Sequence, residues 1–118
     1  MFRKHTISIK NAYNGLVWSL KTQPNYRIHL ILSSLSVIAG FYLKISYLEF
    51  IIIAFLITVG LVIETINTAI EEATDAIDTK IREDIKIAKD VSAAAMLIYA
   101  IGATVIALMI FIPKIFNF

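Results

Sequence analysis

The sequence predicts an all-α integral membrane protein with an N-terminal amphipathic surface helix and three transmembrane helices. Two observations lead to this class: 58% of the 118 residues are hydrophobic, and three long apolar runs take up about half of the chain. A soluble domain usually has an apolar share near half and much shorter apolar runs. We therefore expect residues 1–118 to form a single membrane-embedded domain.

The segment from about residue 4 to residue 22 mixes apolar and polar side chains at helical spacing. Its aromatic residues, Tyr13 and Trp18, are of the kind that sits at a membrane interface. This pattern predicts an amphipathic helix that lies in the membrane surface. Pro24 is expected to end the helix, because proline has no backbone N–H to continue the hydrogen-bond ladder.

The three predicted spans are about 28–43, 50–70 and 91–112, which are 16, 21 and 22 residues long. The first is short for a hydrocarbon core of roughly 30 Å. However, tyrosine and basic side chains flank it and can anchor both of its ends, namely Tyr26, Arg27, Tyr42 and Lys44. His29, near its start, is expected to lie at the interface rather than to act as a ligand.

The basic residues predict the orientation. Nine of the eleven lysines and arginines precede the first span or lie between the second and third, and only Lys44 and Lys114 fall on the opposite side. The positive-inside rule then places the N-terminus and the loop between the second and third spans in the cytoplasm, with the protein integral to the cytoplasmic (inner) membrane.

Two classes of function are set aside by composition. A net charge of +2, without a basic cluster among exposed aromatics, gives no indication of a nucleic-acid partner. The absence of cysteine excludes disulfides, thiolate metal sites and cysteine nucleophiles.

A stripe of polar residues begins inside the second span and continues beyond its end. Glu64, Asn67, Glu71, Asp75 and Asp78 are spaced by three, four, four and three residues, so they fall on one face of a helix. If the chain folds back as a hairpin, Lys86, Lys89 and Asp90 reach the depth of Glu71. Carboxylates at a membrane boundary are costly, and they are therefore functional candidates.

These residue types suit phosphoryl transfer, which needs carboxylates for Mg²⁺, a cation for the moving phosphoryl group and a base for the attacking hydroxyl. Neither GxxxxGK[ST] nor GxGxxG occurs, so the usual nucleotide loops are absent. Residue types alone leave a structural role equally open, in which Glu64 and Asn67 hydrogen-bond neighbouring helices. Ser92 and the alanines after it are expected to allow close helix packing.

Three segments carry a resemblance to a known family: ETINTAIEEATDAID, KIAKDVSAAAML and KNAYNGLVWSLKTQPNYRIH. The first is similar to the pattern E-x-x-N-[ST]-A-[IV]-E-x-x-x-D, and the second to the A-K-D segment that leads into a last span. Together they cover nearly the whole chain. The sequence resembles the prokaryotic diacylglycerol kinase family, the small membrane lipid kinases that include undecaprenol kinase.

The resemblance implies a homotrimer with active sites shared between subunits at the cytoplasmic face. It implies ATP-dependent phosphorylation of the hydroxyl of a membrane lipid, undecaprenol or diacylglycerol, with Mg²⁺ as cofactor and ATP as co-substrate. The implied catalytic residues are Glu64, Asn67 and Lys89, with Glu64 as the base. The implied nucleotide-binding residues are Asn11, Gly15, Gln23, Glu71, Lys89 and Asp90, and Glu71 is the implied metal ligand.

One position departs from the family pattern. Gln23 stands where the family usually has a metal-binding glutamate, and a neutral amide binds Mg²⁺ more weakly than a carboxylate does. Gln23 is therefore a doubtful second metal ligand, and a catalytically weakened kinase homologue is one alternative. The other is a small oligomeric proton-coupled transporter or channel subunit, with Glu64 as its proton or cation site.

Overall fold

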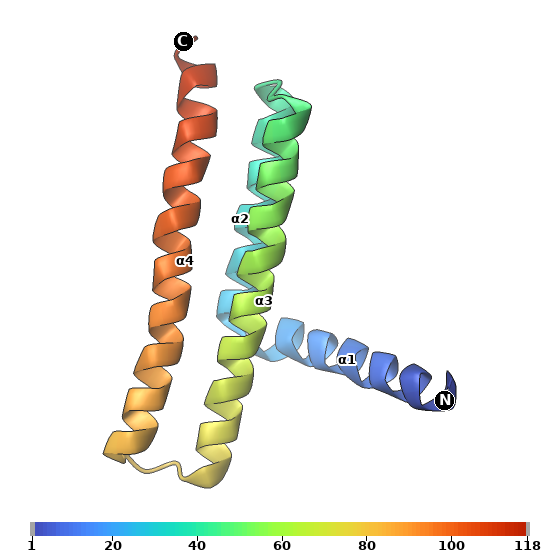
Figure 1. The fold of residues 1–118 in the computed structure, drawn as a ribbon, viewed down its shortest axis with the longest axis vertical. Helices are drawn as coiled ribbons and strands as arrows, with labels where there is room; N and C mark the ends of the chain where they lie inside the picture. Colours follow the sequence, from blue (N-terminus) through green and yellow to red (C-terminus); the bar gives the residue numbers. More distant parts are fainter. Residues whose placement is uncertain (1, 118) are drawn as a thin grey trace.

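The computed structural model describes residues 2–117, which form four helices. They are α1 (Phe2–Thr22), α2 (Pro24–Tyr42), α3 (Tyr47–Ile77) and α4 (Glu83–Ile115). The last three stand side by side as an antiparallel bundle, and α1 projects sideways from the start of α2, at a level beyond which α3 and α4 continue (Figure 1). The predicted all-helical class is therefore confirmed.

The junction of α1 and α2 forms where the sequence predicts it. Gln23 has an extended backbone, with φ −106° and ψ 105°, and Pro24 occupies the first turn of α2. Proline suits this place because its fixed φ matches a helix and its missing N–H would have no partner there. The exposed apolar side chains of α1 include Ile7, Ile9, Tyr13, Leu16, Trp18 and Leu20. The helix over 4–22 is thus confirmed, and its position in a membrane surface stays a prediction.

A short turn between α2 and α3 closes the opposite end of the bundle. The Ser46 hydroxyl accepts a hydrogen bond from the Glu49 backbone N–H, and the Glu49 carboxylate accepts one from the Ser46 N–H at 2.8 Å. This capping box satisfies two backbone donors at the start of α3. Beside it, the buried side chains of Ile45 in the turn, Ile53 of α3 and Ile110 of α4 form a small apolar core.

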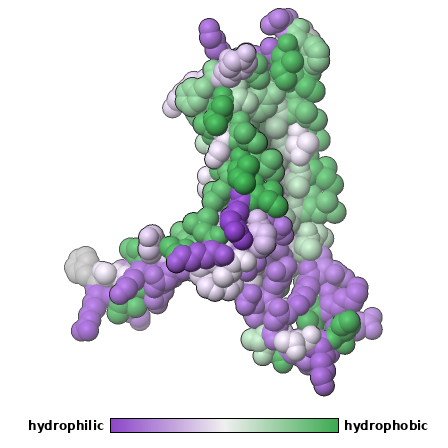
Figure 2. Space-filling model, turned by 180° about the vertical axis from the view of Figure 1, so that it is seen from behind, coloured by the Kyte–Doolittle hydropathy of each residue, from purple (hydrophilic) through white to green (hydrophobic). Residues whose placement is uncertain are grey.

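Two helices within residues 2–117, α3 and α4, are long and apolar enough to cross a membrane. Their apolar side chains point mostly outward, as in Phe55, Val62, Leu97 and Ile101. Figure 2 shows the result as a broad hydrophobic surface over the upper bundle, with hydrophilic side chains gathered below it. Such a surface suits lipid and would be unfavourable in water. That the shorter α2 also crosses the membrane stays a prediction.

Both long helices continue beyond the apolar runs from which the spans were predicted. α3 extends past Ile70 to Ile77, because the residues that follow are mainly good helix formers such as glutamate and alanine. α4 begins at Glu83 and continues through Pro113, which interrupts only the last turn of the helix. Glu64, Asn67, Glu71 and Asp75 of the polar stripe therefore lie on one unbroken helix. The prediction was wrong for Asp78, which follows the end of α3 and has an extended backbone, with φ −163° and ψ 130°.

α3 and α4 come into close contact at Gly60. A Cβ added there would lie 2.6 Å from the hydroxyl oxygen of Tyr99 and 2.7 Å from its Cζ. The same hydroxyl donates a hydrogen bond to the carbonyl oxygen of Leu56. Small residues permit this kind of close helix contact in membranes.

We expect Gly60→Ala to destabilise the protein by about 1–3 kcal/mol, because the tyrosine ring must move to make room for the methyl group. Gly102→Ala is the matched control, since nothing lies within 4 Å of a Cβ at that position. Thermal unfolding of the detergent-solubilised protein, followed by circular dichroism, measures both changes. Equal losses of stability in the two variants would contradict the packing at Gly60.

Candidate active site

The candidate site is centred on one face of α3, here called the acidic face, which carries Glu64, Asn67 and Glu71. Glu64, Asn67 and Glu71 follow each other at spacings of three and four residues, which places them one above the other. In the single chain, Glu64 is 4% exposed and Asn67 is 9% exposed, whereas Glu71 is half-buried. Within residues 2–117, no donor hydrogen-bonds to the carboxylate of Glu64. The face therefore presents the carboxylate of a largely buried residue, to which no group of the described chain donates a hydrogen bond.

Asn67 connects this face to α4. Its side-chain oxygen accepts a hydrogen bond from the Ser92 hydroxyl at 2.6 Å, and its amide nitrogen donates to Glu71 Oε1 at 3.5 Å. Ser92 is itself only 7% exposed. Asn67 thus has the structural role that the sequence left open, because it hydrogen-bonds α3 to α4. Ser92 of α4 in this way fixes the amide that orients the Glu71 carboxylate. Sequence reasoning assigned Ser92 to close packing only and missed this hydrogen bond.

We expect Ser92→Ala to cost about 1–3 kcal/mol of stability, because the buried Asn67 oxygen then has no partner. Activity should also fall, since the amide that orients Glu71 is no longer fixed. Unfolding and turnover should be measured beside Ser34→Ala, a control whose exposed hydroxyl bonds only to a carbonyl of its own helix. If both variants behave alike, the Ser92–Asn67 bond has no part in the site.

Lys89 supplies the positive charge nearest to this face. Its ammonium forms an ion pair with the carboxylate of Asp75 on α3, and the charge of Glu71 also acts on it. The hydrogen bond that Lys89 donates to the Asp75 carboxylate raises the pKa of Lys89, which precedes the uncharged run of α4, so the ammonium stays positive at neutral pH. The predicted hairpin is therefore present, with Lys89 at the level of Glu71.

Asp90 lies one residue further along α4 and is exposed. Its carboxylate accepts a hydrogen bond from the Lys86 ammonium at 2.8 Å, one turn earlier on the same helix. Because adjacent helical residues are about 100° apart, Asp90 faces away from the Lys89–Asp75 pair. Within one chain, the structure does not bring Asp90 together with Glu71.

The remaining predicted residues belong to α1 and its junction with α2. The amide nitrogen of Gln23 donates to the Thr22 hydroxyl at 3.3 Å, which leaves its oxygen free of intramolecular bonds among the described residues. Asn11 is exposed, and open space surrounds Gly15. Because α1 projects away from the bundle (Figure 1), Asn11 and Gly15 do not pack against the acidic face of their own chain.

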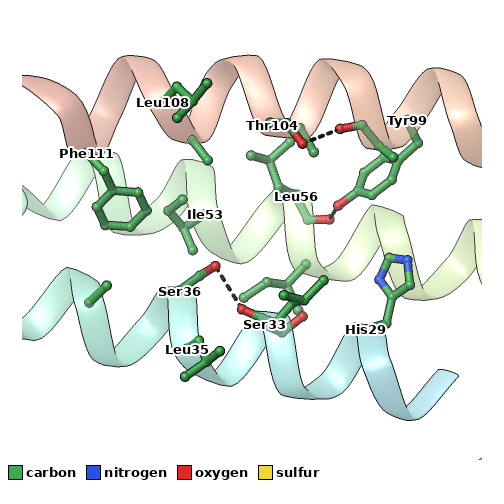
Figure 3. A pocket seen from close by; sticks show the side chains of 16 residues that line it. His29, Ser33, Leu35, Ser36, Ile53, Leu56, Tyr99, Thr104, Leu108 and Phe111 are labelled. Atoms are coloured by element: carbon green, nitrogen blue, oxygen red, sulfur yellow. Dashed lines mark hydrogen bonds between the residues drawn. The ribbon is translucent and has the colours of Figure 1, made fainter. Parts of the chain in front are cut away.

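An apolar groove of about 480 Å³ runs along α3 between α2 and α4. Figure 3 shows His29 and Tyr99 at one end of it and Phe111 at the other. His29 is half-buried, and the Tyr99 ring beside it lies against Gly60, one helical turn before Glu64 on α3. The groove thus ends beside the acidic face. From the sequence, His29 was expected only at the membrane interface, and no pattern indicated that it lies close to the acidic face.

Comparison with known proteins gives consistent results. The family model described as prokaryotic diacylglycerol kinase matches residues 10–111. The chain is 34% identical over 108 residues to an undecaprenol kinase of Bacillus subtilis (strain 168), an alignment that covers 92% of this chain and 88% of that protein. It is 28% identical over 112 residues to a diacylglycerol kinase of Synechocystis sp., with 94% of this chain and 64% of that protein covered.

The matched region contains every residue of the acidic face, together with Lys89 and Ser92. It also contains all of α2 and α3 and nearly all of the apolar part of α4. On the strength of this match and of the membrane-type helices, the chain belongs to the prokaryotic diacylglycerol kinase family and is a membrane lipid kinase.

Proposed function

We propose that the protein transfers the γ-phosphoryl group of ATP to the hydroxyl group of a membrane lipid. Undecaprenol is the first candidate for this lipid, and diacylglycerol is the second. One observation carries this proposal: Glu64, Asn67 and Glu71 share a buried face of α3, and Lys89 of α4 lies beside it. The higher identity to an undecaprenol kinase supports the order of the two lipids.

The depth of these groups fits a reaction between a lipid and a soluble nucleotide. Glu64 lies within the apolar run of α3, where a lipid hydroxyl can reach it. Lys89 and Asp75 lie at the hydrophilic end of the bundle, where the phosphates of ATP can approach from water (Figure 2). Glu71 lies between them, one turn from Asn67 and within the electrostatic reach of Lys89.

In the proposed reaction, the lipid oxygen forms a bond to the γ-phosphorus, and the bond from that phosphorus to the β–γ bridging oxygen breaks. The hydroxyl proton passes to the carboxylate of Glu64, and ADP leaves. Glu64 suits the role of base because its carboxylate has no donor of its own among the described residues. Lys89 offsets the negative charge that develops on the phosphates.

The oxygen ligands that the protein offers fit a Mg²⁺ ion that is also bound by the nucleotide phosphates. Within residues 2–117, no three acidic or histidine side chains lie close enough together to hold a metal by themselves. Mg²⁺ typically needs only one or two carboxylates, because phosphate oxygens and waters complete its coordination. Glu71 would be the protein ligand, and the oxygen of Gln23 would be a weaker second one. Bound there, the ion would neutralise charge on the transferring phosphoryl group.

The position of α1 supports a homotrimer with shared sites. Asn11, Gly15 and Gln23 are expected to contact the nucleotide, yet α1 points away from the acidic face of its own chain (Figure 1). A neighbouring subunit would bring another acidic face within reach of α1. We further propose that α2 crosses the membrane as a third span, so that residues 1–118 form one domain. The N-terminus and the active site then lie on the cytoplasmic side of the inner membrane.

A phosphorylation assay with γ-labelled ATP tests this function. The purified protein should be given undecaprenol, diacylglycerol and ceramide side by side, each with Mg²⁺. We expect label in the lipid extract, most of it in undecaprenyl phosphate. Absence of labelled lipid in all three reactions would overturn the kinase function. Proton-coupled flux in vesicles without ATP consumption would favour a transporter instead.

A further inference from the structure

The apolar groove ends in a polar side chain whose hydrogen-bonding capacity is unused. Of the four other polar side chains in its wall, three are already occupied: Ser36 donates to the Leu32 carbonyl, Thr104 to the Ala100 carbonyl and Tyr99 to the Leu56 carbonyl (Figure 3). The fourth, Ser33, has no hydrogen bond among the described residues, and it lies one helical turn beyond His29, further from Glu64. Among the described residues, neither ring nitrogen of His29 makes a hydrogen bond. His29 is therefore free to bind a ligand in the groove.

The position of the His29 ring is fixed by its neighbour on α4. Its centroid lies 6.1 Å from that of the Tyr99 ring, and the two ring planes are tilted by 33°. Tyr99 is itself held, because its hydroxyl is bonded to α3 and its ring lies against Gly60. The imidazole thus rests against a rigid wall at the end of the groove.

The same ring lies near Glu64. The Tyr99 ring beside it lies against Gly60, and Glu64 follows Gly60 by one helical turn on the same face of α3. The ring with free nitrogens therefore lines the end of an apolar space, and a carboxylate without a donor lies one turn beyond that end. A long-chain alcohol matches this arrangement, since it has one hydroxyl at the end of an apolar chain.

We propose that His29 positions the hydroxyl group of the lipid substrate against Glu64. A ring N–H of His29 donates a hydrogen bond to the lipid oxygen, whose own proton points at the carboxylate of Glu64. The first carbons of the lipid lie in the end of the groove, against Tyr99. This inference rests on the lipid kinase function proposed above, and it adds the residue that orients the acceptor.

The test compares His29→Leu, which removes the donor, with His29→Gln, whose amide keeps a donor at similar reach. Initial rates are measured with undecaprenol or diacylglycerol varied at saturating Mg–ATP, and then with ATP varied at saturating lipid. We expect His29→Leu to raise the KM for the lipid about tenfold, as for the loss of one hydrogen bond. The KM for ATP should not change, and His29→Gln should recover most of the loss.

Ser36→Ala is the matched control, because its hydroxyl is bonded within α2 in the same groove wall. Unchanged lipid kinetics in His29→Leu, or equal increases in both KM values, would overturn the role of His29. If His29→Leu does not assemble, His29→Asn is used in its place. The asparagine amide is shorter and should not reach the lipid oxygen, whereas the glutamine amide of His29→Gln should reach it. Identical lipid KM values in those two variants would also overturn the role. A wild-type protein that phosphorylates neither lipid instead overturns the kinase function itself.

Discussion

Replacement of Glu64 by glutamine is expected to lower the turnover number for lipid phosphorylation by at least ~10²-fold, the usual scale for the loss of a positioned base. The amide cannot accept the hydroxyl proton, although it fills the same volume. Glu64 makes no intramolecular hydrogen bond among the described residues, so its replacement by an amide of the same size breaks no such bond. Assembly and thermal stability should therefore remain close to those of the wild type.

Glu72→Gln is the matched control for this experiment. Glu72 is an exposed acid on the same helix, on a different face from Glu64 and Glu71. Both variants should be purified in the same detergent and assayed at saturating lipid and Mg–ATP. Near-normal turnover in Glu64→Gln, or an equal loss in Glu72→Gln, would remove Glu64 from the mechanism.

Lys89→Met should produce the second large effect, a decrease of roughly 10²-fold in kcat/KM for ATP. Methionine keeps much of the length of the side chain and removes the charge that offsets the phosphates. Asp75 loses its partner, but this ion pair is partly exposed, and such pairs contribute little to stability. The fold should therefore survive the change.

Lys80→Met provides the comparison, because Lys80 lies exposed in the loop between α3 and α4. Lys80→Met lowers the net charge by the same amount as Lys89→Met, and it leaves the acidic face unchanged. Steady-state rates with varied ATP distinguish a local role of Lys89 from a general effect of charge. If both substitutions weaken ATP use equally, Lys89 has no specific part in phosphate binding.

The helices were predictable because their signals are local. Apolar runs, the proline at residue 24 and spacings of three and four residues each act within one segment, and α1, α3 and α4 follow them. The common face of Glu64, Asn67 and Glu71 follows from helical geometry alone. The helical spacing of the polar stripe also predicts that α3 continues beyond the span that ends at Ile70, and it does so as far as Ile77, one residue before the last member of the stripe, Asp78.

The contacts between helices could not be predicted in the same way. The Ser92–Asn67 hydrogen bond, the Lys89–Asp75 ion pair and the packing of His29 on Tyr99 each depend on how two helices are aligned along their length. A shift of one residue would replace every one of these pairs. The sequence indicated a hairpin, but the close contact at Gly60 and the alignment that accompanies it appear only in the folded chain.

The most direct test of the central claim is the stoichiometry of the reaction in proteoliposomes. ADP release and lipid phosphate should be counted in the same sample, with undecaprenol as acceptor and Mg–ATP outside. We expect one lipid phosphate for each ADP, and we expect both products to form at least ~10²-fold more slowly when Glu64 is replaced by glutamine. ADP release without lipid phosphate, or lipid phosphate made at the normal rate by Glu64→Gln, would contradict the account.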